Sequence, residues 1–108
     1  MLSVAFWSLI NYPNVDNNMQ DLTQAFEDTV ELVKTARGNF TPSNQLKLEM
    51  YGLYKQATEG DVHGKKPGML DVVGKAKYQA WAKLKGTDST QAMQLYINKV
   101  AEIKSDIT

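Results

Sequence analysis

Tyrosine and lysine side chains stand close together in residues 50–58, which read MYGLYKQAT. If this segment is helical, Leu48, Tyr51 and Lys55 share one face because they are spaced i, i+3 and i+7. The tyrosine hydroxyl and the lysine ammonium both donate hydrogen bonds, and phosphate oxygens accept them. This face therefore fits a ligand with one apolar and one anionic part. The alternative is a solvated lysine beside a scattered exposed tyrosine, which is common on protein surfaces.

Two later residues could contribute to the same chemistry. Lys77 comes one helical turn before Trp81 and borders an apolar row, so it either extends into solvent or brings a charge to an apolar groove. Tyr96 stands inside the apolar row of the last helical segment. It is either a core tyrosine with a satisfied hydroxyl or a further polar contact for a ligand.

Residues for catalysis or metal binding are scarce. The chain has no cysteine, which excludes disulfides and thiolate zinc sites. Its one histidine, His63, lies in a glycine-rich loop without ligand-type spacing, so we expect it to be solvated. Asp61 and Asp71 are expected to act in turns or caps, not as a catalytic pair. The sequence therefore predicts no catalytic residue, no metal site, no cofactor and no enzymatic activity.

The composition is that of one small globular domain. Of 108 residues, 43% are hydrophobic and 22% are charged, which is too apolar for a disordered chain. The 12 Lys and Arg residues balance the 12 Asp and Glu residues. A formal charge near zero argues against nucleic-acid or anionic-membrane binding driven by the field of the whole protein.

The first 20 residues differ from the rest. The apolar run at 4–10 is too short to span a bilayer, and no basic segment precedes it as in a signal peptide. Asparagines and a proline follow, which favour irregular chain. We expect residues 1–20 to be a flexible or loosely docked extension. A short docked helix and a weak interfacial anchor stay open, because Phe6 and Trp7 would be left in water.

Apolar residues recur at helical spacing in four segments, and none shows the sustained alternation of a strand. The rows are Leu22, Phe26, Val30 and Val33; Leu46, Met50, Leu53 and Ala57; Val73, Ala76, Ala80 and Leu84; and Ala92, Met93, Tyr96, Val100 and Ile103. The sequence thus predicts an all-α bundle of four helices over residues 21–106.

The boundaries of the first two helices follow from capping patterns. Asp21 and Gln24 form a capping-box pattern that is expected to open the first helix, and Gly38 is expected to stop it. Thr41 is expected to cap the second helix, with Pro42 as its first helical residue.

Glycines mark the later boundaries. Gly60 is expected to end the second helix, and residues 60–71 form a long loop with three glycines and a proline. Gly86 is expected to close the third helix, and Thr87 or Asp88 to cap the fourth.

Several motifs occur in order along the chain: YxxYKQATxGD at 51–61, KPGMLD at 66–71, GKAKYxAW at 74–81, LKG at 84–86 and AMxxYIxKV at 92–100. Together they resemble the signature of acyl-CoA-binding proteins, also called the diazepam-binding inhibitor family. The resemblance runs from about Phe26 to Glu102. It implies an up-down-down-up four-helix bundle, in agreement with the helix count.

The resemblance also implies a function and a ligand site. Members are non-catalytic, cytoplasmic carriers or buffers of medium- to long-chain acyl-CoA esters, with no nucleic-acid partner and no stable membrane insertion. A bundle of this size is most simply a monomer. The implied contacts are Tyr51, Lys55 and Lys77 at the 3′-phosphate of CoA, Tyr54 at the adenine, Lys34 and Tyr96 elsewhere on the headgroup, and Leu48 at the acyl chain.

The chain departs from the common family pattern. Tyr78 stands where many relatives have tryptophan, and Lys47 replaces a more usual apolar residue. The connection between the first two helices is about two residues longer, and the extension has no counterpart in minimal members. A second functional hypothesis is therefore a helical protein-interaction module whose extension recruits a partner.

Overall fold

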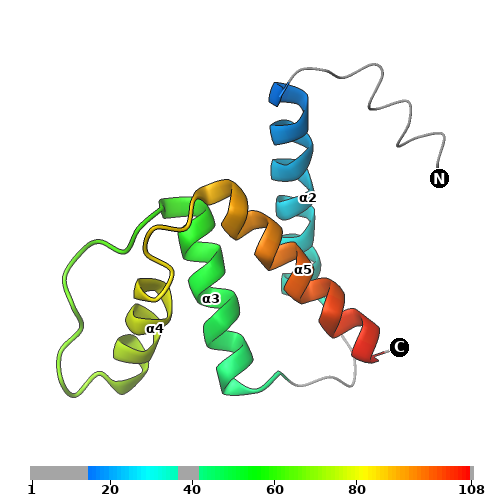
Figure 1. The fold of residues 1–108 in the computed structure, drawn as a ribbon. Helices are drawn as coiled ribbons and strands as arrows, with labels where there is room; N and C mark the ends of the chain where they lie inside the picture. Colours follow the sequence, from blue (N-terminus) through cyan, green and yellow to red (C-terminus); the bar gives the residue numbers. More distant parts are fainter. Residues whose placement is uncertain (1–14, 37–41, 108) are drawn as a thin grey trace.

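The computed structural model describes residues 15–36 and 42–107, which form four α-helices (Figure 1). They are α2 (Val15–Thr35), α3 (Asn44–Glu59), α4 (Val72–Ala82) and α5 (Ser89–Ile107). Helices α2 and α5 run in one direction and α3 and α4 in the other (Figure 1). Helix α3 packs against both α4 and α5, and α2 packs against α5. The predicted all-α, up-down-down-up bundle is confirmed.

The hydrophobic core lies where α2, α3 and α5 meet. Its buried residues are Phe26, Leu53, Ala57, Ala92, Tyr96 and Val100. The rings of Phe26 and Tyr96 pack edge to face with their centroids 5.2 Å apart, which joins α2 to α5. The apolar rows predicted for the second and fourth helices supply most of this core.

The predicted start of the first helix is wrong. Helix α2 begins at Val15, so Asp21 lies inside the helix, and the Gln24 side chain donates to Asp28 at 3.0 Å. No glycine or proline interrupts residues 15–35, and the small unfavourable propensity of asparagine in a helix does not break it. The expected division at residues 20 and 21 therefore falls within a helix. The rest of the extension, residues 1–14, and the expected stop at Gly38 lie outside the described residues.

The N-cap of α3 also differs from the prediction. Ser43 is the cap, and its hydroxyl accepts a hydrogen bond from the Leu46 amide at 3.1 Å. Pro42 precedes the cap instead of opening the helix, and Thr41 lies outside the described residues. A serine three residues before an unpaired helical amide satisfies it directly. The predicted end of the helix is confirmed, since Gly60 has φ 78°.

Aspartates cap the last two helices. The Asp71 carboxylate accepts from the Gly74 amide at 2.9 Å, and the Asp88 carboxylate accepts from the Gln91 amide at 2.7 Å. Each carboxylate satisfies an amide that lacks an intrahelical partner. The expected cap roles of these residues are confirmed.

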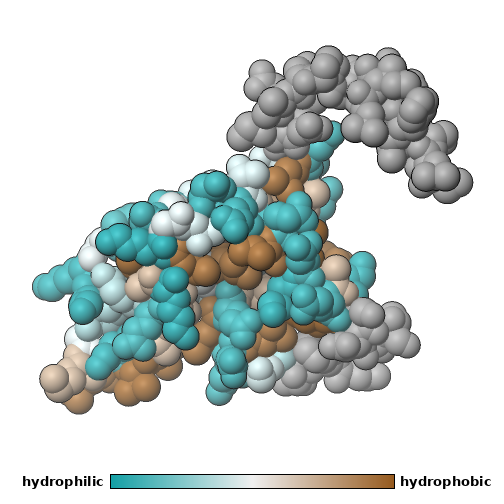
Figure 2. Space-filling view, viewed as in Figure 1, coloured by the Kyte–Doolittle hydropathy of each residue, from teal (hydrophilic) through white to brown (hydrophobic). Residues whose placement is uncertain are grey.

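Helix α4 is less embedded than the sequence predicted. It has 11 residues and, among the described helices, packs only on α3. Trp81 is its buried residue, whereas Val73, expected in the apolar row, is 68% exposed. Figure 2 shows hydrophobic surface at the corner of the molecule where α4 begins.

The backbones of α3 and α4 touch at Gly52. A Cβ atom on Gly52 would lie 2.6 Å from the Ala80 carbonyl oxygen, closer than real Cβ contacts. The glycine therefore permits a close approach that brings the side chains on either side of this contact together.

Polar contacts join the C-terminal end of α3 to the turn between α4 and α5. The fully buried Gln56 amide donates to the Asp61 carboxylate at 2.9 Å and to the Thr87 carbonyl at 2.7 Å. Asp61 also accepts from the Gly86 amide at 2.8 Å. That bond, followed by the one from Gln56, holds the pKa of Asp61 below its ordinary 3.8. The ionised Asp61 carboxylate therefore stabilises the fold at any pH above this ordinary value. That stabilisation is lost as the pH falls through the lower pKa of the folded state.

Candidate functional site

Tyr51 and Lys77 meet across the contact between α3 and α4. The Lys77 ammonium lies 5.0 Å from the centroid of the Tyr51 ring, a cation–π distance. Their approach follows from the close packing at Gly52, one residue after Tyr51. The two residues therefore present a phenol hydroxyl and an ammonium from neighbouring helices.

Lys55 lies on the same side of α3. Its ammonium is 4.9 Å from the Trp81 ring centroid and forms an ion pair with the Glu59 carboxylate. The hydrogen bond to Glu59 is the main cause of the raised pKa of Lys55, and partial burial opposes it. The same bond lowers the pKa of Glu59. Lys55 is thus a cation at neutral pH, and its ammonium lies between the Glu59 carboxylate and the Trp81 indole.

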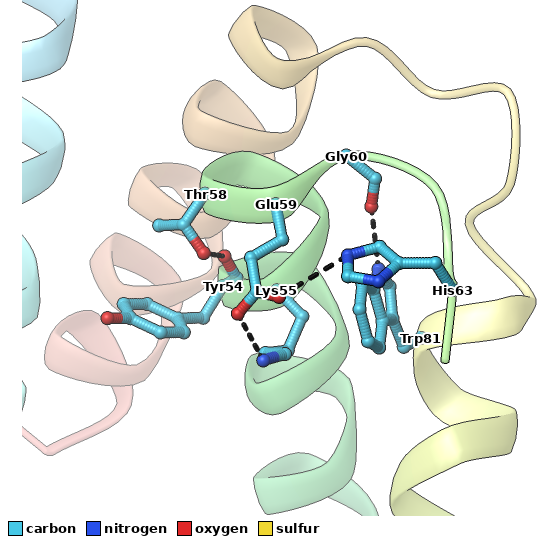
Figure 3. A network of polar contacts seen from close by, with 7 residues as sticks. All are labelled: Tyr54, Lys55, Thr58, Glu59, Gly60, His63 and Trp81. Carbon is cyan, nitrogen blue, oxygen red and sulfur yellow. Dashed lines mark hydrogen bonds and ion pairs between the residues drawn. The ribbon is translucent and has the colours of Figure 1, made fainter. Parts of the chain in front are cut away.

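His63 and Trp81 complete this network (Figure 3). The Trp81 indole donates to the Gly60 carbonyl at 2.7 Å, which fixes the ring beneath Lys55. The His63 ring packs edge-on against Trp81 at 5.2 Å, and its Nε2 lies 3.5 Å from Glu59. The side chain of His63 is 64% exposed, as expected for a loop histidine, yet it has defined neighbours.

The contacts of Glu59 and His63 were not predicted from the sequence. Glu59 follows Lys55 by four residues, and that helical spacing could have indicated the ion pair. His63 lies beyond the end of the helix, so no helical periodicity predicts its contact with Trp81. Lys77 comes one helical turn before Trp81, but the cation–π contact of Trp81 is with Lys55.

Tyr54 and Tyr96 both contact Phe26, on the side of α3 that faces the core. The Tyr54 ring stacks on Phe26 with centroids 6.2 Å apart, and in Figure 3 it points away from Lys55 and Trp81. Tyr96 is 4% exposed, and burial is the main cause of its raised pKa, with a smaller effect from Tyr54. The Tyr96 ring therefore lies in the core, and a ligand contact through its hydroxyl stays a prediction.

Leu48 lines a groove of about 610 Å³ between α3, α4 and α5. Its apolar lining comes from Leu48, Leu53, Ala76, Ala80, Leu84 and Leu95. Tyr51, Lys55 and Lys77 do not line this groove. They lie beside it, since Leu48 is one turn before Tyr51 and Ala76 precedes Lys77 on α4.

Sequence comparison identifies the family. The family profile described as "Acyl CoA binding protein" matches residues 23–100. The chain is 43% identical over 82 residues to "Acyl-CoA-binding protein" of Ricinus communis, which covers 76% of this chain and 89% of the relative. It is 42% identical over 82 residues to "Acyl-CoA-binding protein homolog 1" of Caenorhabditis elegans, with 76% and 93% covered. The chain belongs to the acyl-CoA-binding protein family.

A solved structure of the family has the same fold. The crystal structure of Oryza sativa Acyl-CoA-Binding Protein 2 superposes with a TM-score of 0.73 at 39% identity, covering 79% of this chain and 92% of that one. Acyl-CoA-binding proteins bind acyl-CoA esters as ligands. The Tyr51, Lys55 and Lys77 cluster and the neighbouring groove are therefore considered as candidate parts of such a site.

The seven residues expected to contact acyl-CoA fall into four groups. Tyr51, Lys55 and Lys77 lie together, Tyr54 lies near Tyr96, Leu48 is in the groove, and Lys34 stands apart. Lys34 is exposed in the last turn of α2 and shares none of the contacts that join the others. Their roles toward a ligand stay predictions.

Two other expectations concern metals and membranes. Within residues 15–36 and 42–107, no group of three His, Asp or Glu side chains could hold a metal ion. Among the helices of this described part, none combines the length and apolar character needed to cross a bilayer.

Proposed function

We propose that this acyl-CoA-binding protein carries and buffers medium- to long-chain acyl-CoA esters in the cytoplasm without chemically changing them. The observation that supports this most directly is the meeting of Lys77 and Tyr51 across α3 and α4, with Lys55 on the same side. Two ammonium groups and a phenol hydroxyl offer the donors that a ribose 3′-phosphate requires.

The phosphate would change the partner of Lys55. Without ligand, the Lys55 ammonium forms an ion pair with Glu59 and lies close to Trp81. An incoming phosphate competes with Glu59 for the same hydrogen-bond donors. Lys77 has no such competitor among the described ion pairs, and it lies against the Tyr51 ring. We therefore expect Lys77 to meet the phosphate more freely than Lys55.

The adenine is assigned to the exposed side of Tyr54. This ring is 37% exposed and stacks on Phe26, so the core holds one side of it in place. A second aromatic ring can stack on the accessible side at little cost in side-chain ordering. Lys34 and the hydroxyl of Tyr96 are proposed as further headgroup contacts on the sequence resemblance alone.

The acyl chain is assigned to the groove that contains Leu48. Burial of a methylene contributes about 0.8 kcal/mol, so roughly a dozen carbons contribute on the order of 10 kcal/mol. Charged hydrogen bonds to the phosphate contribute roughly 1.5–3 kcal/mol each. The loss of translational and rotational freedom opposes binding by about 4–15 kcal/mol. Neither half of the ligand should therefore bind tightly by itself.

The absence of catalysis is part of the proposal. Hydrolysis or transfer of a thioester requires a nucleophile with an adjacent base, or a metal. His63 is paired with Glu59 and packed on Trp81, and no cysteine accompanies it. Incubation with palmitoyl-CoA should release no free thiol, and steady thiol release proportional to the protein concentration would contradict this part of the proposal.

Calorimetry with three ligands tests binding. Palmitoyl-CoA is expected to bind tightly, free CoA weakly and palmitate poorly, because only the ester occupies both the groove and the phosphate donors. Binding of palmitate as tight as that of palmitoyl-CoA would show that the Tyr and Lys cluster takes no part.

A further inference from the structure

The Glu59 carboxylate contacts two basic side chains at once. Its Oε2 atom pairs with the Lys55 ammonium, and its Oε1 atom lies 3.5 Å from Nε2 of His63 (Figure 3). Both basic side chains also lie against the Trp81 indole, the ammonium 4.9 Å and the imidazole centroid 5.2 Å from the ring centroid. One of the two lysines assigned to the 3′-phosphate is therefore coupled to the one histidine of the chain.

The stability of α3 does not explain Glu59. It is the last residue of the helix, and no lysine or arginine lies in the same last turn. An acidic side chain at this end is unfavourable, because it faces the negative end of the helix dipole. The side chain is 40% exposed, so its partners can exchange. A residue that opposes a local preference in this way is often present for function.

The surroundings of His63 identify Glu59 as its acidic partner. Helix α3 contributes Glu59 and Lys55, and α4 contributes the uncharged Trp81 indole. The charged residues of the loop that contains His63 are Asp61, Lys65, Lys66 and Asp71. Both of these aspartates accept hydrogen bonds from backbone amides elsewhere. Among the described residues, Glu59 is thus the acid in contact with the imidazole.

We propose that Glu59 and His63 make phosphate binding by Lys55 depend on pH, so that acyl-CoA binds more tightly as the pH falls from about 8 to about 5.5. This inference rests on the proposed carrier function and adds two positioning residues to it. Imidazoles change charge in this range, whereas lysines do not. Glu59 stays ionised, because its hydrogen bond to Lys55 lowers its pKa below the ordinary 4.5.

The direction of the effect follows from the state of Glu59 after the phosphate has taken Lys55. With a neutral imidazole, the released carboxylate is an unpaired negative charge beside the phosphate, and the two repel. With a protonated imidazole, the carboxylate keeps a cationic partner, and a charge-assisted hydrogen bond replaces the 3.5 Å contact. The ligand-bound state thus favours the protonated imidazole. By linkage, the affinity for acyl-CoA rises as the pH falls.

Calorimetric titration of the full chain with palmitoyl-CoA at pH values of about 5.5 and about 8 tests the proposal. The comparison is with His63→Gln, which keeps a hydrogen-bond donor but does not titrate. The ratio of parent to variant affinity should be about threefold larger at the lower pH, within the range of an exposed ion pair. Both proteins bind the same ligand, so titration of the phosphate itself cancels in this ratio.

Two further variants and one ligand separate this mechanism from others. Glu59→Gln should lose the pH response, since no carboxylate remains to be paired. Lys65→Gln removes a positive charge from the same loop and should keep the pH response of the parent chain. With 3′-dephospho-palmitoyl-CoA, the ratio of parent to His63→Gln affinity should be the same at both pH values, because that ligand does not draw Lys55 from Glu59. Circular dichroism checks that each variant is folded.

Three outcomes would overturn the proposal. An equal pH dependence in the parent chain and His63→Gln would do so and would leave the carrier function intact. A full pH response in Glu59→Gln would mean that the imidazole acts on the ligand directly. The third outcome, no palmitoyl-CoA binding at either pH, would refute the carrier function and this inference with it.

Discussion

The two sides of α3 differ in how they are covered. Toward α2 and α5, Phe26, Ala57, Ala92, Tyr96 and Val100 are all at most 6% exposed. Toward α4, the contact depends on the bare backbone of Gly52 and on the indole of Trp81. Lysines and a tyrosine border that second contact. Apolar burial thus dominates one side, while the other keeps polar groups at the surface.

This difference separates stability from binding. An apolar side chain in the core is surrounded by protein and has no room for a ligand. Because α4 packs on one helix only, its lysines and the facing residues of α3 keep solvent access. One helix therefore supports the fold with one face and can offer ligand contacts with another, and substitutions on the two faces should have different effects.

The largest expected effect is on the core side. Phe26→Ala removes a 3% exposed ring that contacts both Tyr54 and Tyr96, so it should lower the free energy of unfolding by about 3–5 kcal/mol. Urea denaturation followed by circular dichroism measures this. Leu32→Ala, at an exposed position on the same helix, should change it by about 0.5 kcal/mol or less. A loss below about 1 kcal/mol for Phe26→Ala would mean that the core is centred elsewhere.

The next effect concerns the side that faces α4. Lys77→Ala should weaken palmitoyl-CoA binding roughly ten- to 150-fold through the loss of a charged hydrogen bond. The loss should be much smaller for 3′-dephospho-palmitoyl-CoA, and the free energy of unfolding should change by about 0.5 kcal/mol or less. Calorimetry with both ligands provides the comparison.

Lys75→Ala is the control for that comparison. It removes the same charge from the same helix, two residues earlier, where no acyl-CoA contact is expected. Its affinity for both ligands should stay close to that of the parent chain. If Lys77→Ala weakened both ligands equally, Lys77 would not contact the 3′-phosphate.

The smallest expected effect is a gain in affinity for palmitoyl-CoA instead of a loss. Glu59→Gln removes the acidic partner of Lys55, so palmitoyl-CoA should bind up to about fivefold more tightly, the range expected for a solvent-accessible ion pair. The pKa of Lys55 should fall back toward its ordinary value while the group stays charged at neutral pH. Glu31→Gln on α2 controls for the change in net charge. Weaker binding of palmitoyl-CoA by Glu59→Gln would mean that Glu59 positions Lys55 for the ligand instead of competing with it.

The sequence by itself determined the number of helices in the part of the chain that the structure describes, the apolar rows of α3 and α5, the stop at Gly60 and the family. These features depend on neighbours along the chain: a repeating spacing, a residue tolerant of positive φ, or a carboxylate three residues before an amide. The same local reasoning failed at the start of α2. There, asparagines and an acidic residue fit either a loop or a continuing helix.

Only the tertiary structure decided which helix faces pack against each other. Helical spacing placed Leu48, Tyr51 and Lys55 on one face, but not α4 beside that face. It could not show that Trp81 lies under Lys55, that Gln56 is buried against Asp61, or that Val73 is exposed. Periodicity records which residues point the same way. What covers them depends on how closely the helices approach, here at Gly52, and on where the connecting loop ends.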